Sequence, residues 1–264
     1  MLRSALLNVM VQAAQKAGRN LRRDFGEIEK LQVSIKGPGN YASAADRKAE
    51  ETLYKELTKA RPGYGFLGEE GGTREGADKT HTWIVDPLDG TTNFLHGIPH
   101  FAVSIGLERE GTLIAGVVYN PVTEDIYFAE RGKGAFHNDS RIRVAGRGEI
   151  NHALAACSLP HIGRNFPETD AELAAMQTRV AGLRRYGATA LDLAYIAAGR
   201  FDLCWDRGVK PWDLAAGIVL VREAGGFVTD IDGGDAMFAK GHFAAGNEAM
   251  HREALAILAR AEKA

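Results

Sequence analysis

The chain has 264 residues, of which 45% are hydrophobic and 25% charged, with 32 Lys and Arg against 34 Asp and Glu and a formal net charge of −2. This length allows one large domain, or two tightly joined halves, with a substantial core. The near balance of charge gives no support to a dedicated nucleic-acid binder, and the ordinary apolar fraction excludes intrinsic disorder. Thirty-one glycines, well above the usual ~7%, indicate many tight turns and close backbone approaches.

Cysteine and targeting signals indicate a soluble chain in a reducing compartment. Cys157 and Cys204 are far apart and lack a CxxC pattern or a neighbouring histidine cluster, so neither a disulfide framework nor a zinc site is indicated. The basic stretch 1–25 has no signal-peptide cleavage site, and the longest apolar run, 214–221, is far shorter than the ~20 residues that span a bilayer. We therefore expect a cytoplasmic protein that does not insert into a membrane.

The first half of the chain predicts two helices followed by strands. Apolar residues recur every three or four positions from Leu2 to Leu21, which predicts an amphipathic helix ending near Gly26. The polar stretch from Ser34 to Ser43 is expected to be a loop. The remaining elements predicted here are a helix at 45–57 stopped by Pro62-Gly63, a short buried strand at 83–85, and an antiparallel meander of strands at 101–108, 113–119 and 125–129.

The second half alternates strands and helices after a glycine-containing break at 146–148. Its helix at 211–224 has the clearest boundaries, because Pro211 and Asp213 begin it and Gly225-Gly226 end it. No internal repeat or long linker is present, so 1–146 and 147–264 are expected to be two halves of one compact unit. The other elements predicted here are strands at 153–159, 201–205 and 228–230 and helices at 168–181, 188–198 and from about 248.

The strongest chemical signal lies in Trp83–Phe94, where an apolar strand delivers Asp86 and Asp89 to its C-terminal end. Gly90 lets the backbone fold sharply, so that the amides of Gly90 and Thr91 can point outward together as an anion site. Because carboxylates repel phosphate, two acids beside such a site imply a hard divalent cation between them, and Mg²⁺ is the expected ion. The alternative is an ordinary turn in which both aspartates bind backbone amides and cap a helix.

Two further acidic positions favour the metal site over the simple turn. Glu69 lies in the glycine-rich sequence 68–72 directly after an apolar pair, and Asp213 lies in the first turn of the helix at 211–224. Taken singly, Glu69 is explained as a solvated loop acid and Asp213 as compensation of the helix dipole. Three acidic sites with this local geometry in one chain are harder to explain in that way.

These motifs resemble those of the inositol monophosphatase family of Mg²⁺-dependent, lithium-sensitive sugar-phosphate phosphatases. The resemblance covers nearly the whole chain and rests on Gly68-Glu69-Glu70, on 83–94, and on Lys210-Pro211-Trp212-Asp213 followed by 223–226. The stretch 184–195 is most similar to the bacterial inositol-1-monophosphatase branch. The resemblance implies an α/β (α+β) fold layered as an αβαβα sandwich, an active site where the two halves meet, and a homodimer.

By matching position, the resemblance places two or three Mg²⁺ ions in one site. Their ligands would be Glu69, Asp86, the Leu88 carbonyl, Asp89 and Asp213. Glu69, with the Thr91 hydroxyl, would activate a water for in-line attack on phosphorus. The groups that bind the phosphate and the polyol hydroxyls would be Asp89, the Gly90 and Thr91 amides, Arg184, the backbone near Ala190, Asp206 and Asp213.

Two departures from the family pattern concern the substrate side. The family usually has glutamate where this chain has Asp206, so the shorter side chain affects substrate preference rather than the reaction. In the N-terminal loop that leads to Asp46, Asn40 stands where the family often has a carboxylate. Lys36 in that loop is expected to be a solvated lysine, with a reach into the site as the alternative.

The leading function is hydrolysis of inositol 1-phosphate, and the sequence leaves other functions open. A haloacid-dehalogenase-type phosphatase would need a D-x-D-G-T motif, whereas Asp86 and Asp89 are separated by two residues. A histidinol-phosphate or fructose-1,6-bisphosphate phosphatase would share all the metal ligands. An added role with RNA polymerase in ribosomal-RNA transcription complexes gains no support from the net charge. It would use a basic surface such as Arg179, Arg184, Arg185 and Arg200.

Overall fold

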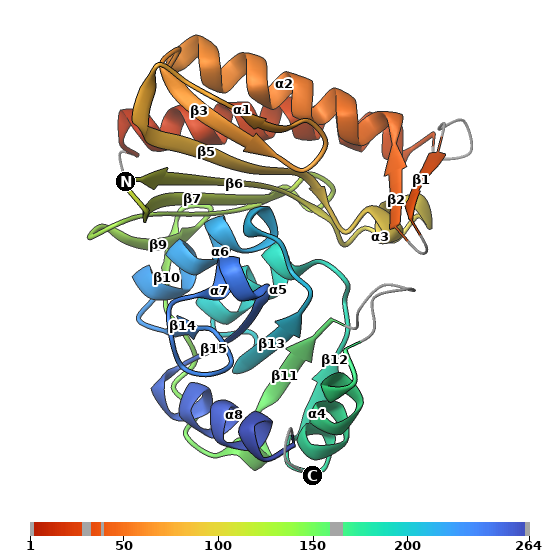
Figure 1. The fold of residues 1–264 in the computed structure, drawn as a ribbon, viewed down its shortest axis with the longest axis vertical. Helices are drawn as coiled ribbons and strands as arrows, with labels where there is room; N and C mark the ends of the chain where they lie inside the picture. The colour runs from red at the N-terminus through yellow and green to blue at the C-terminus, as the bar shows by residue number, and fades with distance from the viewer. Residues whose placement is uncertain (1–2, 28–32, 38–39, 159–165, 262–264) are drawn as a thin grey trace.

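The computed structural model describes residues 3–27, 33–37, 40–158 and 166–261, with only the backbone described at 33–37 and 40–43. Helices and two large sheets alternate in layers along the long axis of the molecule (Figure 1). The layers are a helix pair, an eight-stranded sheet, a second helix pair, a five-stranded sheet and a last helix pair. The predicted αβαβα sandwich of the α/β (α+β) class is confirmed.

The outer helix pair of the first half consists of α1 (Ala5–Phe25) and α2 (Ala44–Ala60), which pack against each other. α1 begins where the Ser4 hydroxyl accepts a hydrogen bond from the Leu7 N–H at 3.1 Å. It ends at Gly26, as predicted. Both helices bury one apolar stripe toward the first sheet, which explains why helical spacing located them in the sequence.

The first sheet has eight strands in the order β10-β9-β8-β7-β6-β5-β3-β4. β3 and β5 run parallel, and the other neighbouring strands are antiparallel. The predicted antiparallel meander is confirmed as β6, β7 and β8. The strands are β3 (Tyr64–Gly68), β4 (Gly72–Arg74), β5 (Asp78–Asp89), β6 (Ala102–Arg109), β7 (Thr112–Asn120), β8 (Asp125–Glu130), β9 (Gly134–His137) and β10 (Ser140–Ile142).

β5 is longer than the strand predicted at 83–85 and carries both aspartates of the central motif within it. Asp86 pairs with Ser104 of β6 and Asp89 pairs with Ala102, so β5 has one more residue than β6 between these two pairs. Pro87 lies at this irregularity, where its missing N–H costs no ladder hydrogen bond. The result is a strand whose last residues bend out of regular pairing and lead directly into α3 (Thr91–Leu95).

The middle helix pair joins the two halves. α5 (Thr189–Ala197) and α6 (Pro211–Glu223) pack against each other between the two sheets (Figure 1). The backbone of α6 lies so close to β7 that a Cβ on Gly116 would come within 2.8 Å of the Ala216 Cα. A glycine at 116 therefore sets how closely helices of the second half approach the sheet of the first.

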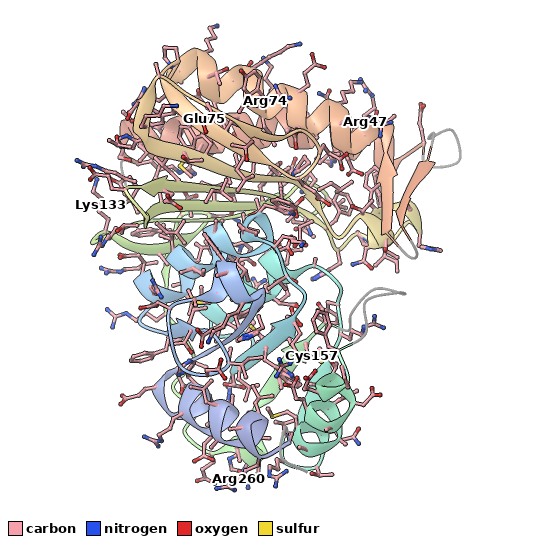
Figure 2. All side chains as sticks on the ribbon, viewed as in Figure 1. Arg47, Arg74, Glu75, Lys133, Cys157 and Arg260 are labelled. Carbon is pink, nitrogen blue, oxygen red and sulfur yellow. The ribbon has the colours of Figure 1, made fainter. Side chains whose placement is uncertain are left out.

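The second sheet has five strands in the order β12-β11-β13-β15-β14 and is covered on its outer face by α4 and α8. Cys157 (labelled in Figure 2) and Cys204 lie on adjacent strands of this sheet as buried free thiols, and burial raises the pKa of Cys157 to about 12. The elements are β11 (Leu154–Cys157), β12 (Gly182–Arg184), β13 (Leu203–Arg207), β14 (Phe227–Thr229), β15 (His242–Gly246), α4 (Glu168–Gln177), α7 (Met237–Lys240) and α8 (Glu248–Ala261).

The prediction of a loop from Ser34 to Ser43 is wrong for most of that stretch. β1 (Val33–Gly37) and β2 (Asn40–Ser43) form an antiparallel hairpin in which Val33 pairs with Ser43. The polar composition hid this pairing, because an isolated hairpin has few apolar positions to mark it. The side chain of Lys36 lies outside the described residues, as does Leu159 in the predicted strand 153–159.

Within the described ranges, none of the helices combines the length and the apolar character needed to cross a bilayer.

Candidate active site

Glu69 and Asp86 are brought together because they follow or end neighbouring parallel strands. β3 pairs with β5 so that Gly68 lies opposite Val85. The Glu69 N–H donates a hydrogen bond to the Val85 carbonyl at 3.3 Å, which extends this pairing by one residue. The carboxyl ends of parallel strands meet at the same edge of a sheet, so the Glu69 backbone is held directly beside Asp86.

Asp86 and Asp89 are the buried acids at the end of β5. Asp86 is 2% exposed and Asp89 8% exposed. Asp86 Oδ1 accepts a hydrogen bond from the Leu88 N–H at 2.9 Å. Asp89 Oδ2 accepts one from the Ala190 N–H in the first turn of α5, at 2.8 Å. The backbone of Ala190 therefore lies beside the acidic site, and its N–H donates to Asp89.

The turn at Gly90 has the sharp geometry that the sequence predicts. Gly90 adopts a φ of 91°, in the left-handed region, and a Cβ there would come within 3.0 Å of the His100 carbonyl oxygen. This turn lets the Thr91 hydroxyl donate back to the Leu88 carbonyl at 3.1 Å. The structure therefore joins Thr91 and Leu88, two of the residues that the sequence assigned to the reaction.

Asp213 makes a capping contact and also faces the acidic site. Its Oδ2 accepts a hydrogen bond from the Lys210 N–H at 2.7 Å, which stabilises the start of α6. This capping contact goes beyond the compensation of the helix dipole that the sequence leaves open for Asp213. The charge of Asp213 also raises the pKa of both Asp86 and Asp89, so the two roles are combined in one side chain.

The acids of the two halves form one electrostatic unit. Burial raises the pKa of Asp86 well above its usual range, and the charges of Glu69, Asp89 and Asp213 raise it further. Burial likewise raises the pKa of Asp89, with Asp213 as the largest charge contribution. An active site where the halves meet is thus supported by the mutual effect on pKa of Asp86 and Asp89 in β5, Asp213 in α6 and Glu69 in the loop directly after β3.

The donor chemistry of these acids fits a hard divalent cation. In the ranges that the structure describes, no three or more His, Cys, Asp or Glu side chains are arranged as a finished metal site. Buried carboxylates that raise one another's pKa are nevertheless costly to ionise together, and a divalent cation removes that cost. Carboxylate and carbonyl oxygens are the ligands that Mg²⁺ takes.

Asp206 lies on β13 with its carboxylate already engaged. It is 2% exposed, and it accepts hydrogen bonds from the Ser158 N–H and, at 3.1 Å, from the Thr189 hydroxyl. Burial raises its pKa to about 7. Arg184 is exposed and donates to the Leu183 carbonyl at 3.1 Å, whereas the arginine whose charge lowers the pKa of Asp206 is Arg185.

Two buried acids next to this site were not assigned a role from the sequence. Asp192 on α5 is 1% exposed, and neither carboxylate oxygen is hydrogen-bonded within the described part of the chain. Burial raises the pKa of Asp192 well above the usual range, and the charges of Asp206 and Asp89 raise it further. Glu50 on α2 is 3% exposed. Both acids occupy apolar faces of their helices, a signal that the sequence already contained.

Comparison with known proteins shows the family of this chain. Residues 2–263 match the inositol monophosphatase family. An inositol-1-monophosphatase of Mesorhizobium japonicum is 60% identical over 259 residues, which cover 97% of this chain and 96% of that protein. The Nus factor SuhB of Pseudomonas aeruginosa is 43% identical over 247 residues, which cover 92% of this chain and 91% of that protein.

The solved structures show the same fold. The crystal structure of the extragenic suppressor protein suhB from Bartonella henselae superposes with a TM-score of 0.95 at 54% sequence identity, covering 97% of this chain and 98% of that chain. The layered architecture therefore also occurs in a solved structure that is 54% identical in sequence to this chain. The chain belongs to the inositol monophosphatase family and is a phosphatase that acts on phosphate monoesters.

Proposed function

We propose that this phosphatase hydrolyses inositol 1-phosphate to myo-inositol and phosphate in a reaction that depends on Mg²⁺. The observation that carries the proposal is the single electrostatic unit formed by Glu69, Asp86, Asp89 and Asp213. Four carboxylates at one site suit the binding of cations that in turn hold a phosphate group. Relatives of 60% and 57% identity carry the name inositol-1-monophosphatase, which supports inositol 1-phosphate as the substrate.

The metal ligands in this proposal are carboxylates and one backbone carbonyl. Two or three Mg²⁺ ions, when bound, supply charge neutralisation on the phosphate and its leaving oxygen and favour ionisation of the attacking water. The groups that would hold these ions are Glu69, Asp86, the Leu88 carbonyl, Asp89 and Asp213. We also propose that Li⁺ inhibits this enzyme, because the resemblance to the family implies lithium sensitivity and the proposed ligands are those of the family.

In this proposal, side chains and backbone amides around the phosphate activate the water and bind the phosphate oxygens. Glu69 takes a proton from the attacking water, and the Thr91 hydroxyl, held against the Leu88 carbonyl, orients that water. The amides of Gly90 and Thr91 donate to the phosphate oxygens. Asp89 keeps one oxygen on the Ala190 N–H, so its orientation toward the phosphate is set by α5.

The polyol is proposed to bind on the side of the second half. Asp206, Asp213 and Arg184 are the groups assigned to its hydroxyls. Asp206 is anchored by Thr189, so its position is set while its shorter side chain leaves more room than a glutamate would. The shorter side chain at this position is the departure from the family pattern that bears on substrate preference.

The test of the substrate is a panel of phosphate esters. Inositol 1-phosphate, fructose 1,6-bisphosphate, histidinol phosphate and glycerol 2-phosphate are assayed with Mg²⁺, with and without added Li⁺. We expect inositol 1-phosphate to have the highest kcat/KM and Li⁺ to inhibit its hydrolysis. A higher kcat/KM for histidinol phosphate or fructose 1,6-bisphosphate would replace the proposed substrate by that ester.

A second function is supported by the relatives named Nus factor SuhB, one of which is 43% identical to this chain. We propose an added association with RNA polymerase in ribosomal-RNA transcription. Arg179, Arg184, Arg185 and Arg200 are all exposed and are the residues assigned to this surface. Retention of RNA polymerase subunits on an Asp89→Asn protein would support a role that does not depend on catalysis, and absence of retention would count against it.

The assembly and location are part of the same proposal. We propose a cytoplasmic homodimer in which 1–146 and 147–264 are two halves of one compact unit. The packing of α6 on strands of the first sheet supports the single unit. Light scattering on the purified protein tests the dimer, and a monomer at micromolar concentration would contradict it.

A further inference from the structure

Glu50 reaches from α2 to the loop that carries Glu69. Its Oε2 accepts a hydrogen bond from the Glu70 N–H and its Oε1 accepts one from the Gly71 N–H, both at 2.7 Å. These two amides immediately follow Glu69, whose own N–H is bonded to the Val85 carbonyl. The backbone around Glu69 is therefore held on one side by β5 and on the other by the Glu50 carboxylate.

Two glycines of this loop lie so close to the Glu50 carboxylate that a side chain at either position would collide with it. A Cβ on Gly68 would collide with Glu50 Oε2, and a Cβ on Gly71 would lie 2.7 Å from Oε1. Real Cβ atoms do not approach an oxygen so closely. At two of its glycines, the sequence Gly-Glu-Glu-Gly-Gly thus leaves the space that the buried Glu50 carboxylate and its neighbours occupy.

Burial of the Glu50 carboxylate carries a cost that the fold offsets locally. Burial raises the pKa of Glu50, while the hydrogen bonds from Glu70 and Gly71 and the charge of Arg74 oppose this shift. Arg74, labelled in Figure 2, lies with its guanidinium over the Tyr54 ring of α2 at 4.2 Å from the ring centroid. A carboxylate retained in this place at such a cost holds the loop in a defined position.

We propose that Glu50 is a positioning residue, which fixes the loop after β3 so that the Glu69 carboxylate faces Asp86. This inference rests on the role of Glu69 in the proposed function. Glu50 itself touches neither substrate nor metal. It acts on the reaction through the two amides that follow Glu69.

The main test compares Glu50→Gln with Glu51→Gln. A glutamine has one oxygen acceptor, so one of the two amides loses its partner while the size of the side chain is kept. The control lies next to it on the exposed face of α2, where Glu51 pairs with Lys55 at 2.7 Å. We expect Glu50→Gln to lower kcat and raise the Mg²⁺ concentration for half-maximal rate, each by about 10–100-fold, the range for residues that support metal ligands. KM for the ester is expected to stay within a few fold, and Glu51→Gln is expected to match the wild type.

A second pair of variants disturbs the same contact from the loop side. Gly71→Ala places a Cβ 2.7 Å from Glu50 Oε1 and 2.8 Å from Arg74 Nη2 and leaves the sequence of α2 unchanged, whereas nothing lies within 4 Å of a Cβ on Gly146. We expect Gly71→Ala to change kcat and the Mg²⁺ requirement in the same direction as Glu50→Gln. Gly146→Ala is the matched glycine control and is expected to have no effect. If Glu50→Gln does not fold, this pair of variants still tests whether the contact between Glu50 and the loop affects the reaction.

Hydrogen exchange gives a readout that does not depend on catalysis. In Glu50→Gln the amides of Glu70 and Gly71 are expected to exchange faster, while peptides of the meander β6–β8 keep wild-type exchange. Faster exchange throughout the molecule would show a general stabilising role and overturn the positioning role. Unchanged kcat and unchanged exchange in both variants would also overturn it. If the wild type hydrolyses none of the esters, the proposed function fails, and the exchange experiment still decides what Glu50 does.

Discussion

Asp89 of β5 accepts a hydrogen bond from the Ala190 N–H of α5 at 2.8 Å, although the two residues are 101 positions apart in the chain. A carboxylate of the first half is thereby oriented by the first turn of a helix in the second half. Relative movement of the halves would change the direction of this carboxylate. The alignment of the site therefore depends on the packing of α5 and α6 between the two sheets.

Replacing Asp89 by asparagine should separate catalysis from folding. The amide oxygen of Asp89→Asn can still accept from Ala190, but the variant lacks the charge proposed to bind Mg²⁺. We expect kcat to fall by at least about 10²–10³-fold, the range for loss of a key electrostatic contact, with no loss of thermal stability. Steady-state kinetics at saturating Mg²⁺ and a thermal melt provide the measurement, and near-normal turnover would contradict the assigned role of Asp89.

Thr91→Ala should lower kcat more than Thr91→Ser. The hydroxyl that donates to the Leu88 carbonyl at 3.1 Å is removed by alanine and kept by serine. We expect kcat to fall by about 10–100-fold in Thr91→Ala, as for other groups that orient a metal ligand, and to recover largely in Thr91→Ser. Equal rates for the two variants would show that the methyl group, and not the hydroxyl, is what matters at this position.

The stability of the chain in EDTA should fall as the pH rises toward neutrality. Burial raises the pKa of Asp206 from 3.8 to about 7, so between these values the folded state binds more protons than the unfolded state. A group of this kind stabilises the fold at low pH, and the contribution is lost as the pH rises through the folded pKa. Urea unfolding at pH 5 and pH 8 measures the difference.

The control for this pH dependence is Asp206→Asn, which cannot ionise. We expect the difference in unfolding free energy between pH 5 and pH 8 to be smaller in Asp206→Asn than in the wild type. The other buried acids, Asp86, Asp89 and Asp192, have raised pKa values and keep part of the dependence in the variant. An identical pH dependence in both proteins would show that Asp206 has an ordinary pKa in the fold.

Gly116→Ala tests the contact between the two halves. A Cβ at this position would come within 2.8 Å of the Ala216 Cα, so α6 must shift or β7 must bend. Overpacking of this kind costs about 1–3 kcal/mol in unfolding free energy. Chemical denaturation of this variant beside Gly148→Ala, where nothing lies within 4 Å of the added carbon, provides the comparison. Equal stabilities would mean that the helix layer adapts without strain.

The elements that could be located from the sequence are those with a clear period or clear ends. α1 and α2 bury one apolar face, so the helical spacing of their apolar residues locates them. The meander β6–β8 is buried on both faces and is located instead by β-rich segments separated by turn residues, and α6 by Pro211 and the glycines after it. The hairpin of β1 and β2 and the short strands β3, β4, β9, β10, β12 and β15 were not predicted. These strands have only three to five residues each, which is too short for an apolar pattern to mark them.

The sequence by itself determined which residue types are present for the reaction: the acids Glu69, Asp86, Asp89 and Asp213, the turn at Gly90, and the motifs that resemble the inositol monophosphatase family. Residue type and motif spacing are properties of the sequence, so they can be identified without the fold. Only the tertiary structure decided which of them act on one another. The packing of α6 on the first sheet brings Asp213 into the electrostatic field of Asp86 and Asp89, and burial raises their pKa values. The contact of Glu50 with the loop after β3 likewise exists only once α2 covers that sheet, because helical spacing alone marks a buried position and not its partner.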